Sequence, residues 1–222
     1  MPIAPRPRAV IFDLDGTLVD NMALHAEAFA AFAERHGLPP LTQADRAALD
    51  GRRNSEIFPV LFGRAMEREE WLAYEEEKEA LYRDVSRGRI QRVPGIQALL
   101  EKATAGGLGV ALATSAPGPN VIHTLAEAGL SEAFPIVVRG DQVGRGKPAP
   151  DVFLEASRQL DVPAEDCLVF EDAPVGIVAA RAAGMRVVGL TTTFSAAYFE
   201  ALDEPPDLAC TDFEAFLAAA GW

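Results

Sequence analysis

The stretch VIFDLDGTLVD, residues 10–20, places carboxylates directly after a short apolar run. Asp and Gly are common turn residues, so a solvated turn is the simplest interpretation of this segment. Side chains alternate between the two faces of a strand, however, and Asp13 and Asp15 are therefore expected to point the same way. Two like charges held together are unfavourable unless a cation lies between them or one carboxylate is protonated. The spacing favours a functional carboxylate pair at the end of a buried strand.

Short apolar runs rich in β-branched residues recur along the chain, and helical patterns lie between the later ones. The runs cover residues 9–12, 109–113, 136–138, 167–170 and 186–190. The helical patterns cover residues 121–128, 150–160 and 174–183. Such alternation is typical of βαβ units, which form a parallel sheet with helices on both faces. The sequence therefore predicts an α/β fold.

Residues 20–89 interrupt this alternation, because they contain no convincing strand pattern. Residues recur there at helical spacing in two stripes: Met22, His25, Phe29, Phe32 and His36, and then Trp71, Tyr74, Lys78, Leu81 or Tyr82, and Val85. A Pro94-Gly95 turn follows. We therefore expect a core domain of residues 1–19 and 90–222, with a helical domain of residues 20–89 inserted after the first strand.

Composition limits the classes of partner and compartment. The chain has 222 residues, of which 49% are hydrophobic, enough for one substantial domain or a core with a smaller one. Its net charge of −13 makes nucleic acid and anionic membrane unexpected partners, and no obligate protein partner is predicted. No apolar run is long enough to span a bilayer, and residues 1–8 do not resemble a leader, so we expect a cytoplasmic protein. Cys167 and Cys210 are too few for a disulfide framework.

Polar side chains follow several of the predicted strands. Thr114 and Ser115 come after the second run, and Glu171 and Asp172 come after the fourth. Each pair alone is interpreted as well by a helix cap or a turn, and Lys147 in GRGKPAPD by an ordinary loop lysine. Ligands bind at the carboxyl ends of the strands in open α/β sheets, however, so these side chains are expected to converge.

Together, the converging side chains make chemical sense for phosphoryl transfer. A carboxylate such as Asp13 can accept a phosphoryl group where the developing negative charge is neutralised. Asp13, Asp172 and a backbone carbonyl offer the hard oxygen ligands that suit Mg²⁺. Lys147 would offset the repulsion between Asp13 and an incoming phosphate, and the Thr114 hydroxyl would donate to a phosphate oxygen.

The motifs FDLDGT, ATSA, GKPAPD and FEDAPVGI, in this order and spacing, resemble the four signature motifs of the haloacid dehalogenase-like superfamily. The resemblance covers essentially the whole chain, and the combined set is highly specific. A helical insertion after the first motif resembles subfamily I, in the branch that includes β-phosphoglucomutase and many small phosphatases. The resemblance implies a Rossmann-like three-layer core with a parallel sheet, plus a small helical cap domain.

The resemblance also implies roles for the motif residues. Asp13 would be the nucleophile that forms an aspartyl-phosphate. Asp15 would protonate the leaving oxygen and then take a proton from the attacking water. Thr114 and Lys147 match the phosphate-binding pair of the family.

The Mg²⁺ site implied by the resemblance draws on the same motifs. Asp13 would contribute its carboxylate, and Asp15 its backbone carbonyl. Glu171 and Asp172 match the acidic metal motif, with Asp172 expected as a direct ligand and Glu171 expected to act directly or through water.

Within the superfamily, the first motif separates the candidate reactions. Dehalogenases and phosphonoacetaldehyde hydrolases lack an aspartate at the position of Asp15, so a phosphatase and a phosphosugar mutase remain. His25 and Lys78 fall where β-phosphoglucomutases carry a cap histidine and lysine, although packing within the helical stripes explains them equally well. Asn54 stands where the mutases carry an arginine that grips a second phosphate. Thr17 also departs from the mutase pattern, as does SAPGPN, which lacks its lysine.

The sequence therefore predicts a Mg²⁺-dependent phosphatase that hydrolyses a small phosphorylated metabolite, with sugar phosphates among the candidates. A β-phosphoglucomutase-type mutase is the alternative, and a non-catalytic phosphate- or metal-binding protein is a third. The cap decides the substrate in this family by closing over the site. The candidate substrate-binding residues are Ser115, His25, Arg52, Arg53, Asn54 and Lys78.

Overall fold

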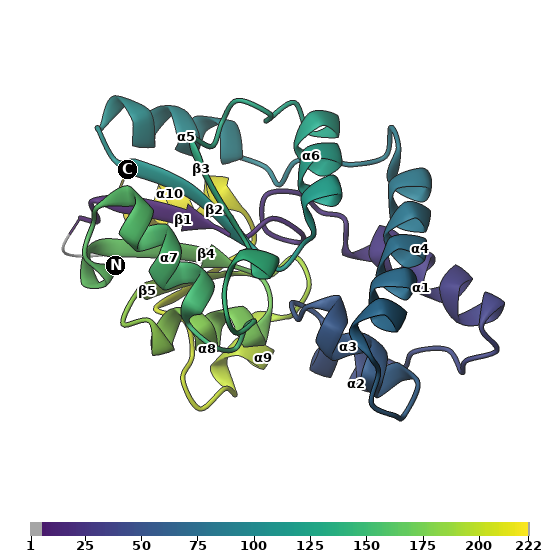
Figure 1. Ribbon diagram of the computed structural model, residues 1–222. Coiled ribbons are helices and arrows are strands. Elements are labelled where there is room, and N and C mark those ends of the chain that lie inside the picture. Colours follow the sequence, from purple (N-terminus) through teal and green to yellow (C-terminus); the bar gives the residue numbers. More distant parts are fainter. Residues whose placement is uncertain (1–5, 222) are drawn as a thin grey trace.

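The computed structural model describes residues 6–221, which contain a six-stranded parallel sheet in the order β3-β2-β1-β4-β5-β6 (Figure 1). The strands are β1 (Ala9–Phe12), β2 (Gly109–Thr114), β3 (Ile136–Arg139), β4 (Cys167–Glu171), β5 (Arg186–Leu190) and β6 (Leu208–Cys210). Each neighbouring pair is parallel. The strand order reverses at β1, which lies between β2 and β4, and such a switch point is where open α/β sheets bind ligands. The predicted α/β fold is confirmed.

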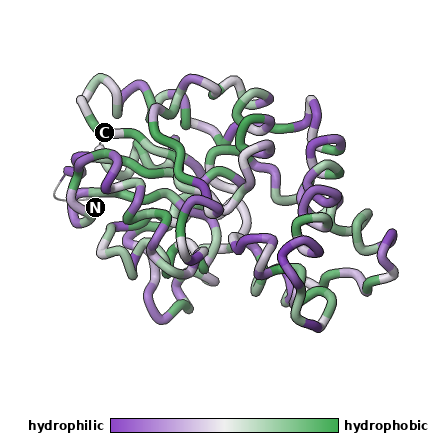
Figure 2. Tube along the Cα trace, in the orientation of Figure 1, coloured by the Kyte–Doolittle hydropathy of each residue, from purple (hydrophilic) through white to green (hydrophobic). Residues whose placement is uncertain are grey.

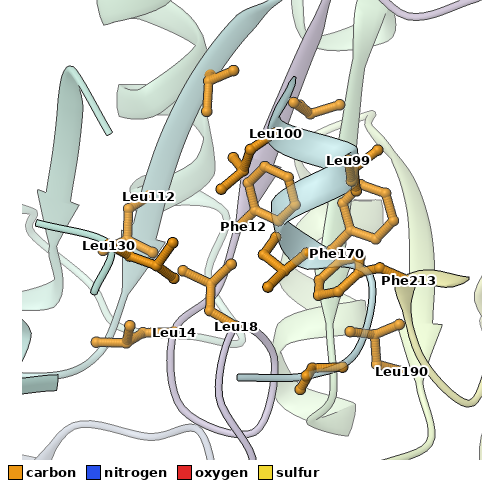
Figure 3. Close-up of a cluster of buried hydrophobic side chains, with 14 of the residues drawn as sticks. Phe12, Leu14, Leu18, Leu99, Leu100, Leu112, Leu130, Phe170, Leu190 and Phe213 are labelled. Carbon is orange, nitrogen blue, oxygen red and sulfur yellow. The ribbon is translucent and has the colours of Figure 1, made fainter. Parts of the chain in front are cut away.

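β1 shows why the central strands are apolar throughout. All four of its side chains are buried, and they alternate between two hydrophobic cores on opposite faces of the sheet. Phe12 stacks on Phe170 with ring centroids 5.1 Å apart, and Phe213 meets the edges of both rings (Figure 3). Figure 2 shows the same pattern, with mainly hydrophobic residues along the strands at the centre of the fold.

Helices cover both faces of the sheet, as three-layer α/β folds require. One core includes side chains of α5 (Ile96–Ala105), α6 (Gly118–Glu127) and α10 (Phe213–Ala220). The other includes side chains of α7 (Asp151–Leu160), α8 (Pro174–Ala182) and α9 (Ala196–Glu200), and short 3-10 turns, η1 (Gly140–Gln142) and η2 (Ala164–Asp166), connect elements on this side. Within residues 6–221, no helix combines the length and apolarity that a membrane crossing requires.

Residues 20–89 fold into helices without a strand, beside the sheet (Figure 1). These helices are α1 (Met22–Arg35), α2 (Gln43–Leu49), α3 (Asn54–Leu61) and α4 (Arg68–Ser86). Phe29, Phe32, Leu49, Ile57 and Phe58 form a separate hydrophobic core there. This arrangement agrees with a helical cap, and we keep the domain boundaries at residues 19–20 and 89–90 as a proposal. Residues 1–5 and 222 of the expected core lie outside the described residues.

The structure extends the elements that the sequence pattern assigns. β2, β3 and β4 each run one residue further than expected, through Thr114, Arg139 and Glu171. The pattern did not assign β6, which has only three residues, or the helices α2, α3, α5, α9 and α10. α9 is too short to show a helical period, and α10 (FEAFLAAA) is apolar on most of its surface, so neither has a clear polar face.

Replacing Phe213 by alanine tests how far the carboxyl-terminal helix holds the core together. Phe213 is fully buried against Phe12 and Phe170. We expect Phe213→Ala to lower the free energy of unfolding by about 3 to 5 kcal/mol, measured by urea denaturation. Tyr198→Ala is the matched control because this ring is 41% exposed, and it should cost less than about 1 kcal/mol. Equal losses in the two variants would contradict the packing described.

Candidate active site

Three carboxylates meet at the carboxyl ends of β1 and β4. Asp13 follows β1, Glu171 ends β4, and Asp172 follows it. All three are buried, and they offer oxygens within 4.8 Å of one another. Because β1 and β4 are adjacent parallel strands with Phe12 opposite Phe170, Asp13 and Glu171 leave the sheet at the same level.

Lys147 inserts its ammonium group among these carboxylates. Its side chain is 1% exposed, and Nζ donates to Asp13 Oδ1 at 2.5 Å and to Glu171 Oε1 at 2.6 Å. Burial alone would lower the pKa of Lys147, but the charges of Asp13 and Glu171 raise it, so the ammonium form persists. Burial raises the pKa of Asp13 to about 7, and nearby Glu171 adds to this effect, while Lys147 opposes it. The surroundings of Asp13 therefore hold more negative charge than one lysine neutralises.

Asp172 has no cationic partner among the hydrogen bonds and ion pairs of residues 6–221. Its carboxylate accepts hydrogen bonds from the hydroxyls of Thr17 and Thr193. Burial raises its pKa well above the ordinary value, and the charges of Glu171 and Asp13 raise it further. Three ionised carboxylates around one ammonium group would leave two excess negative charges, which a divalent cation would balance. Hard carboxylate oxygens are the donor type that such a cation prefers, so the cluster fits a metal site.

Both carboxylate oxygens of Glu171 accept hydrogen bonds from neighbouring groups of the site. Its Oε1 accepts from Lys147, and its Oε2 accepts the backbone N–H groups of Asp172 and Ala173, each at 2.9 Å. Both oxygens are thus engaged. Of the two expected modes for Glu171, this arrangement favours contact with a metal through water.

Two motif glycines make room for the carboxylates. Gly16 has φ +78°, and a Cβ there would overlap the Asp172 carboxylate. A Cβ on Gly176, in α8, would overlap the carboxylate of Glu171. The glycines of DGT and PVGI are therefore required by close approach of a carboxylate to the backbone.

Thr114 and Ser115 follow the same edge of the sheet. The Thr114 hydroxyl oxygen accepts the N–H of Ala116 at 3.0 Å, which leaves its hydrogen for a ligand. Ser115 Oγ instead donates to the carbonyl of Gly51, in the α2–α3 loop, at 2.7 Å. Both residues line the cavity beside Asp13, so Ser115 borders the predicted substrate position while its hydroxyl hydrogen is bonded to the cap.

Asp15 contacts the cap through His25. Asp15 Oδ1 accepts from Asn21 Nδ2 at 2.6 Å and lies 3.4 Å from His25 Nε2. Lys78 Nζ is 3.1 Å from His25 Nδ1, and an ammonium group can only donate, so Nδ1 accepts and a neutral ring carries its proton on Nε2. Burial would raise the pKa of Asp15, but His25 and Asn21 together lower it, which favours the carboxylate.

His25 is therefore buried and close to the motif residue Asp15, and Lys78 is buried and linked to Asp15 through His25. His25 stacks on the Tyr82 ring with centroids 3.8 Å apart, and Lys78 Nζ lies 4.2 Å from the centre of the Phe29 ring. Both line the cavity. Both residues therefore pack within the cap and border the cavity, and an active role for either stays a prediction.

Glu79 lines the cavity and connects the cap to the core. Its Oε1 accepts from Asn54 Nδ2 at 2.6 Å and from Lys78 Nζ at 2.9 Å. Its Oε2 accepts from Asn120 Nδ2, on α6, at 2.6 Å. Burial would raise the pKa of Glu79, but Lys78, His25 and the hydrogen bond from the Asn54 amide lower it. Asn54 therefore presents an amide committed to a carboxylate where the mutase pattern has a cation.

The seam between α4 and α6 is polar along its length. Tyr82 Oη is hydrogen-bonded to Thr124, Arg83 donates to Asn120, and Ser86 is hydrogen-bonded to His123. The contact of Glu79 with Asn120 belongs to the same seam. Cap and core thus meet here through side-chain hydrogen bonds.

Arg52 and Arg53 separate in the structure. Arg52 lines the cavity, and its Nε donates to the Ala48 carbonyl at 2.9 Å. Arg53 does not line the cavity, because its guanidinium donates to the carbonyls of Gly140, at 2.9 Å, and Val143, at 3.3 Å. In this arrangement Arg53 points toward the core loop and not into the cavity, so its expected contact with substrate stays a prediction.

Several site residues were not among the predicted ones. Thr193 follows β5, so the rule that strand ends converge could have found it. Asn21 donates to Asp15 and accepts the N–H of Gly16 at 3.0 Å. Glu79 and Asn120 had no local signal, because the one lies in a charged helical run and the other near a helix start.

Gly176→Ala tests the close approach of α8 to Glu171. Alanine is the better helix former by about 1 kcal/mol, but its Cβ would collide with a carboxylate that is fixed on both oxygens. We expect a net loss of about 1 to 3 kcal/mol in the free energy of unfolding, measured by urea denaturation. Gly118→Ala in α6 is the control, because a Cβ there meets only Arg139 at 3.5 Å or more. A stabilised Gly176→Ala variant would contradict the geometry.

Glu79→Gln tests the buried network that borders the cavity. Removing the charge leaves Lys78 without its carboxylate, so the free energy of unfolding should fall by about 3 to 5 kcal/mol near neutral pH. Because the pKa of Glu79 is lowered on folding, its contribution is complete above the ordinary value of 4.5 and is lost as the pH falls through the folded value. The stability difference between the two proteins, measured by urea titration, should therefore shrink in acid. A difference independent of pH would refute the charge as its cause.

Comparison with known proteins agrees with this geometry. The model of the haloacid dehalogenase-like hydrolase family matches residues 10–190. A phosphorylated carbohydrates phosphatase from Thermotoga maritima is 34% identical over 188 residues, which cover 82% of this chain and 84% of the relative. A family IA hydrolase structure from Entamoeba histolytica is similar with a TM-score of 0.84 and 31% identity, covering 93% and 94% of the two chains. A β-phosphoglucomutase structure from Clostridium difficile reaches 0.80 with 26% identity, covering 93% and 92%. The chain belongs to the haloacid dehalogenase-like hydrolase family.

Proposed function

We propose that the protein is a Mg²⁺-dependent phosphatase that hydrolyses a small phosphorylated metabolite through an aspartyl-phosphate. The observation that carries this proposal is the position of the Lys147 ammonium group between Asp13 and Glu171, beside the Asp172 carboxylate, which has no cationic partner among residues 6–221. A buried carboxylate next to a cation and a candidate metal site is suited to attack an anion, because the surrounding charges offset the repulsion.

Asp13 and Asp172 would hold the Mg²⁺, with the Asp15 carbonyl as a further ligand and Glu171 acting through water. When bound, the cation supplies positive charge that stabilises the transferring phosphoryl group. The excess negative charge of the carboxylate cluster supports this assignment.

In the first step, an oxygen of the Asp13 carboxylate attacks phosphorus and the bond to the leaving oxygen breaks. Lys147 neutralises charge on the phosphoryl oxygens, and Thr114 donates its free hydroxyl hydrogen to one of them. Asp15, in its protonated form, gives its proton to the leaving oxygen, so that a neutral alcohol departs.

In the second step, the ionised Asp15 takes a proton from water as the water oxygen attacks phosphorus. The bond to Asp13 breaks, and inorganic phosphate and the free carboxylate result. The lowered pKa of Asp15 supports the base form, and His25 Nε2 lies 3.4 Å from this carboxylate without a hydrogen bond to it. His25 and Lys78 are thus placed to tune Asp15 rather than to bind phosphate.

The leaving group is best matched by a polyhydroxylated metabolite with one phosphate. Beyond Asp15, the cavity wall presents amides and paired charges from Asn54, Lys78, Glu79 and Asn120, which suit hydroxyl groups. Arg52 lines the cavity, and within residues 6–221 only its Nε is recorded as a donor, to the Ala48 carbonyl, so it is the candidate arginine for contact with the leaving group. The name of the Thermotoga maritima relative, a phosphorylated carbohydrates phosphatase, supports sugar phosphates as the substrate class.

The hydrogen bond from Asn54 to Glu79 also bears on the choice between a phosphatase and a mutase, which moves a phosphate from one position of the sugar to another. A mutase must retain a bisphosphate, and position 54 offers an amide bonded to a carboxylate in place of a cation. That arrangement favours release of phosphate to water.

Phosphate release from a panel of sugar and polyol phosphates tests the proposal. We expect release that requires Mg²⁺, stops with a chelator, and falls by at least about 10⁴-fold in Asp13→Asn, because the amide removes the nucleophile without changing its shape. Asp203→Asn, at an exposed position, is the matched control and should retain wild-type rates. The panel includes β-glucose 1-phosphate with a trace of its bisphosphate.

The same panel separates the alternatives. Formation of glucose 6-phosphate without phosphate release would overturn hydrolysis in favour of a mutase. Binding of Mg²⁺ without turnover of any compound would indicate a non-catalytic binding protein. Wild-type activity in Asp13→Asn would exclude Asp13 as the nucleophile.

A further inference from the structure

The core carries a narrow slot lined by backbone on the loop that leads to Lys147. We define the slot by Gly140, Val143 and Gly146, which follow β3 and precede Lys147. A Cβ on Gly140 would lie 3.2 Å from the Arg53 side chain, and a Cβ on Gly146 would overlap the Arg53 Nε. Arg53 can therefore approach the backbone this closely only because positions 140 and 146 are glycines.

Arg53 of the cap fills this slot. Its methylene stem lies against the two glycines, and its Nη1 donates to the Gly140 and Val143 carbonyls at 2.9 and 3.3 Å. The loop that carries Arg53 joins α2 to α3 and also supplies the cavity residue Arg52. A single loop thus reaches the substrate position with one arginine and the core with the next.

Two further contacts hold the same loop against the core. Ser115 donates to the carbonyl of Gly51 at 2.7 Å. Gly51 has φ +86°, and a Cβ there would lie 2.9 Å from Ala173 Cβ and 2.7 Å from Val175 Cγ2. The loop therefore touches the segments that follow β2, β3 and β4, each of which carries motif residues.

We propose that Arg53 is a positioning residue that seats the cap on the core by filling the slot of Gly140, Val143 and Gly146. Seating fixes two things at once: the place of Arg52 and Asn54 over the cavity, and the backbone that carries Lys147 into the carboxylate cluster. Its effect on turnover rests on the proposed phosphatase function, whereas the seating itself does not.

Arginine is suited to this task because its planar group presents several N–H donors at the end of a long stem. A lysine would place one ammonium group against the same two carbonyls and lose the flat fit between the glycines. Arg53→Lys should therefore recover only part of the loss seen in Arg53→Ala.

A double-mutant cycle tests the slot from both sides. Gly146→Ala should displace the Arg53 side chain from the core side, because the new Cβ would overlap its Nε and lie 3.1 Å from its Cγ and 3.2 Å from its Cζ. We expect Arg53→Ala and Gly146→Ala each to lower kcat by about 10- to 100-fold, and the double variant to be no worse than either single one. Additive losses would show that Gly146→Ala acts on Lys147 directly and would overturn the proposal.

Gly144→Ala is the matched control for the loop substitution. It adds the same methyl group two residues away, where a Cβ meets only Asp151 Oδ2 at 3.6 Å, and it should leave kcat within about twofold of wild type. Arg52→Ala compares the neighbouring arginine. Because Arg52 borders the cavity, its loss should appear mainly in KM, whereas the loss of Arg53 should appear mainly in kcat.

A distance measurement tests seating without turnover. Spin labels at Val60→Cys in the cap and Ile122→Cys in the core occupy exposed positions, and the native Cys167 and Cys210 are buried. With Mg²⁺ and inorganic phosphate present, the wild type should give one narrow distance distribution, and Arg53→Ala and Gly146→Ala should broaden it. Arg52→Ala should leave it narrow.

The two readouts separate failure of the seating from failure of the proposed function. Unchanged distances in Arg53→Ala would overturn the seating, whatever the activity. If the wild type releases no phosphate from any compound while the distances still respond to Arg53, the phosphatase assignment fails and the seating stands.

Discussion

The ion pairs of Lys147 with Asp13 and Glu171 are the constraint on which the rest of the site depends. A buried ammonium group is tolerated only where its partners are close and their other oxygens are satisfied. Adjacent parallel strands bring Asp13 and Glu171 to one level, backbone N–H groups hold the second oxygen of Glu171, and Gly176 leaves it space. The sheet register, the start of α8 and the glycine at position 176 therefore all help to place the two carboxylates that bind the Lys147 ammonium group. These two ion pairs do not involve the neighbouring Asp172, which remains a candidate metal ligand.

Sequence reasoning found this cluster because its members stand at fixed distances from local signals. Each follows an apolar run or precedes a helix, and the parallel sheet then brings the strand ends together. The predicted strands were at most one residue short. The sequence pattern did not predict β6, because three residues are too few to show a period. It did not predict α10, because a helix that is apolar on most sides shows no clear periodicity. The core of the fold and the charged centre were therefore predictable from patterns spanning about ten residues.

The cap side of the site could not be predicted in the same way. Arg53 bonds to residues 87 and 90 positions away, and Asn120 bonds to Glu79 across 41 positions. The direction of a loop side chain depends on how two packed units meet, which no local pattern specifies. His25 and Lys78 were ambiguous for a related reason, because a helical stripe that packs and one that reaches a cavity have the same period. The consecutive arginines Arg52 and Arg53 illustrate the limit most clearly.

The polar seam between α4 and α6 has a thermodynamic consequence for movement of the cap. Separating Tyr82 from Thr124 and Ser86 from His123 would hydrate hydroxyl and imidazole groups, and it would also expose the Tyr82 ring, which makes a T-shaped contact with the His123 ring. Exposure of apolar surface raises heat capacity and exposure of polar surface lowers it. Because opening this seam would expose both kinds of surface, the two contributions would oppose each other and the heat capacity would change little. The balance between open and seated caps would then vary gently with temperature, and water would replace the broken hydrogen bonds at small net cost. A seam of this kind lets the cap separate from the core without exposing a large hydrophobic surface that would favour aggregation.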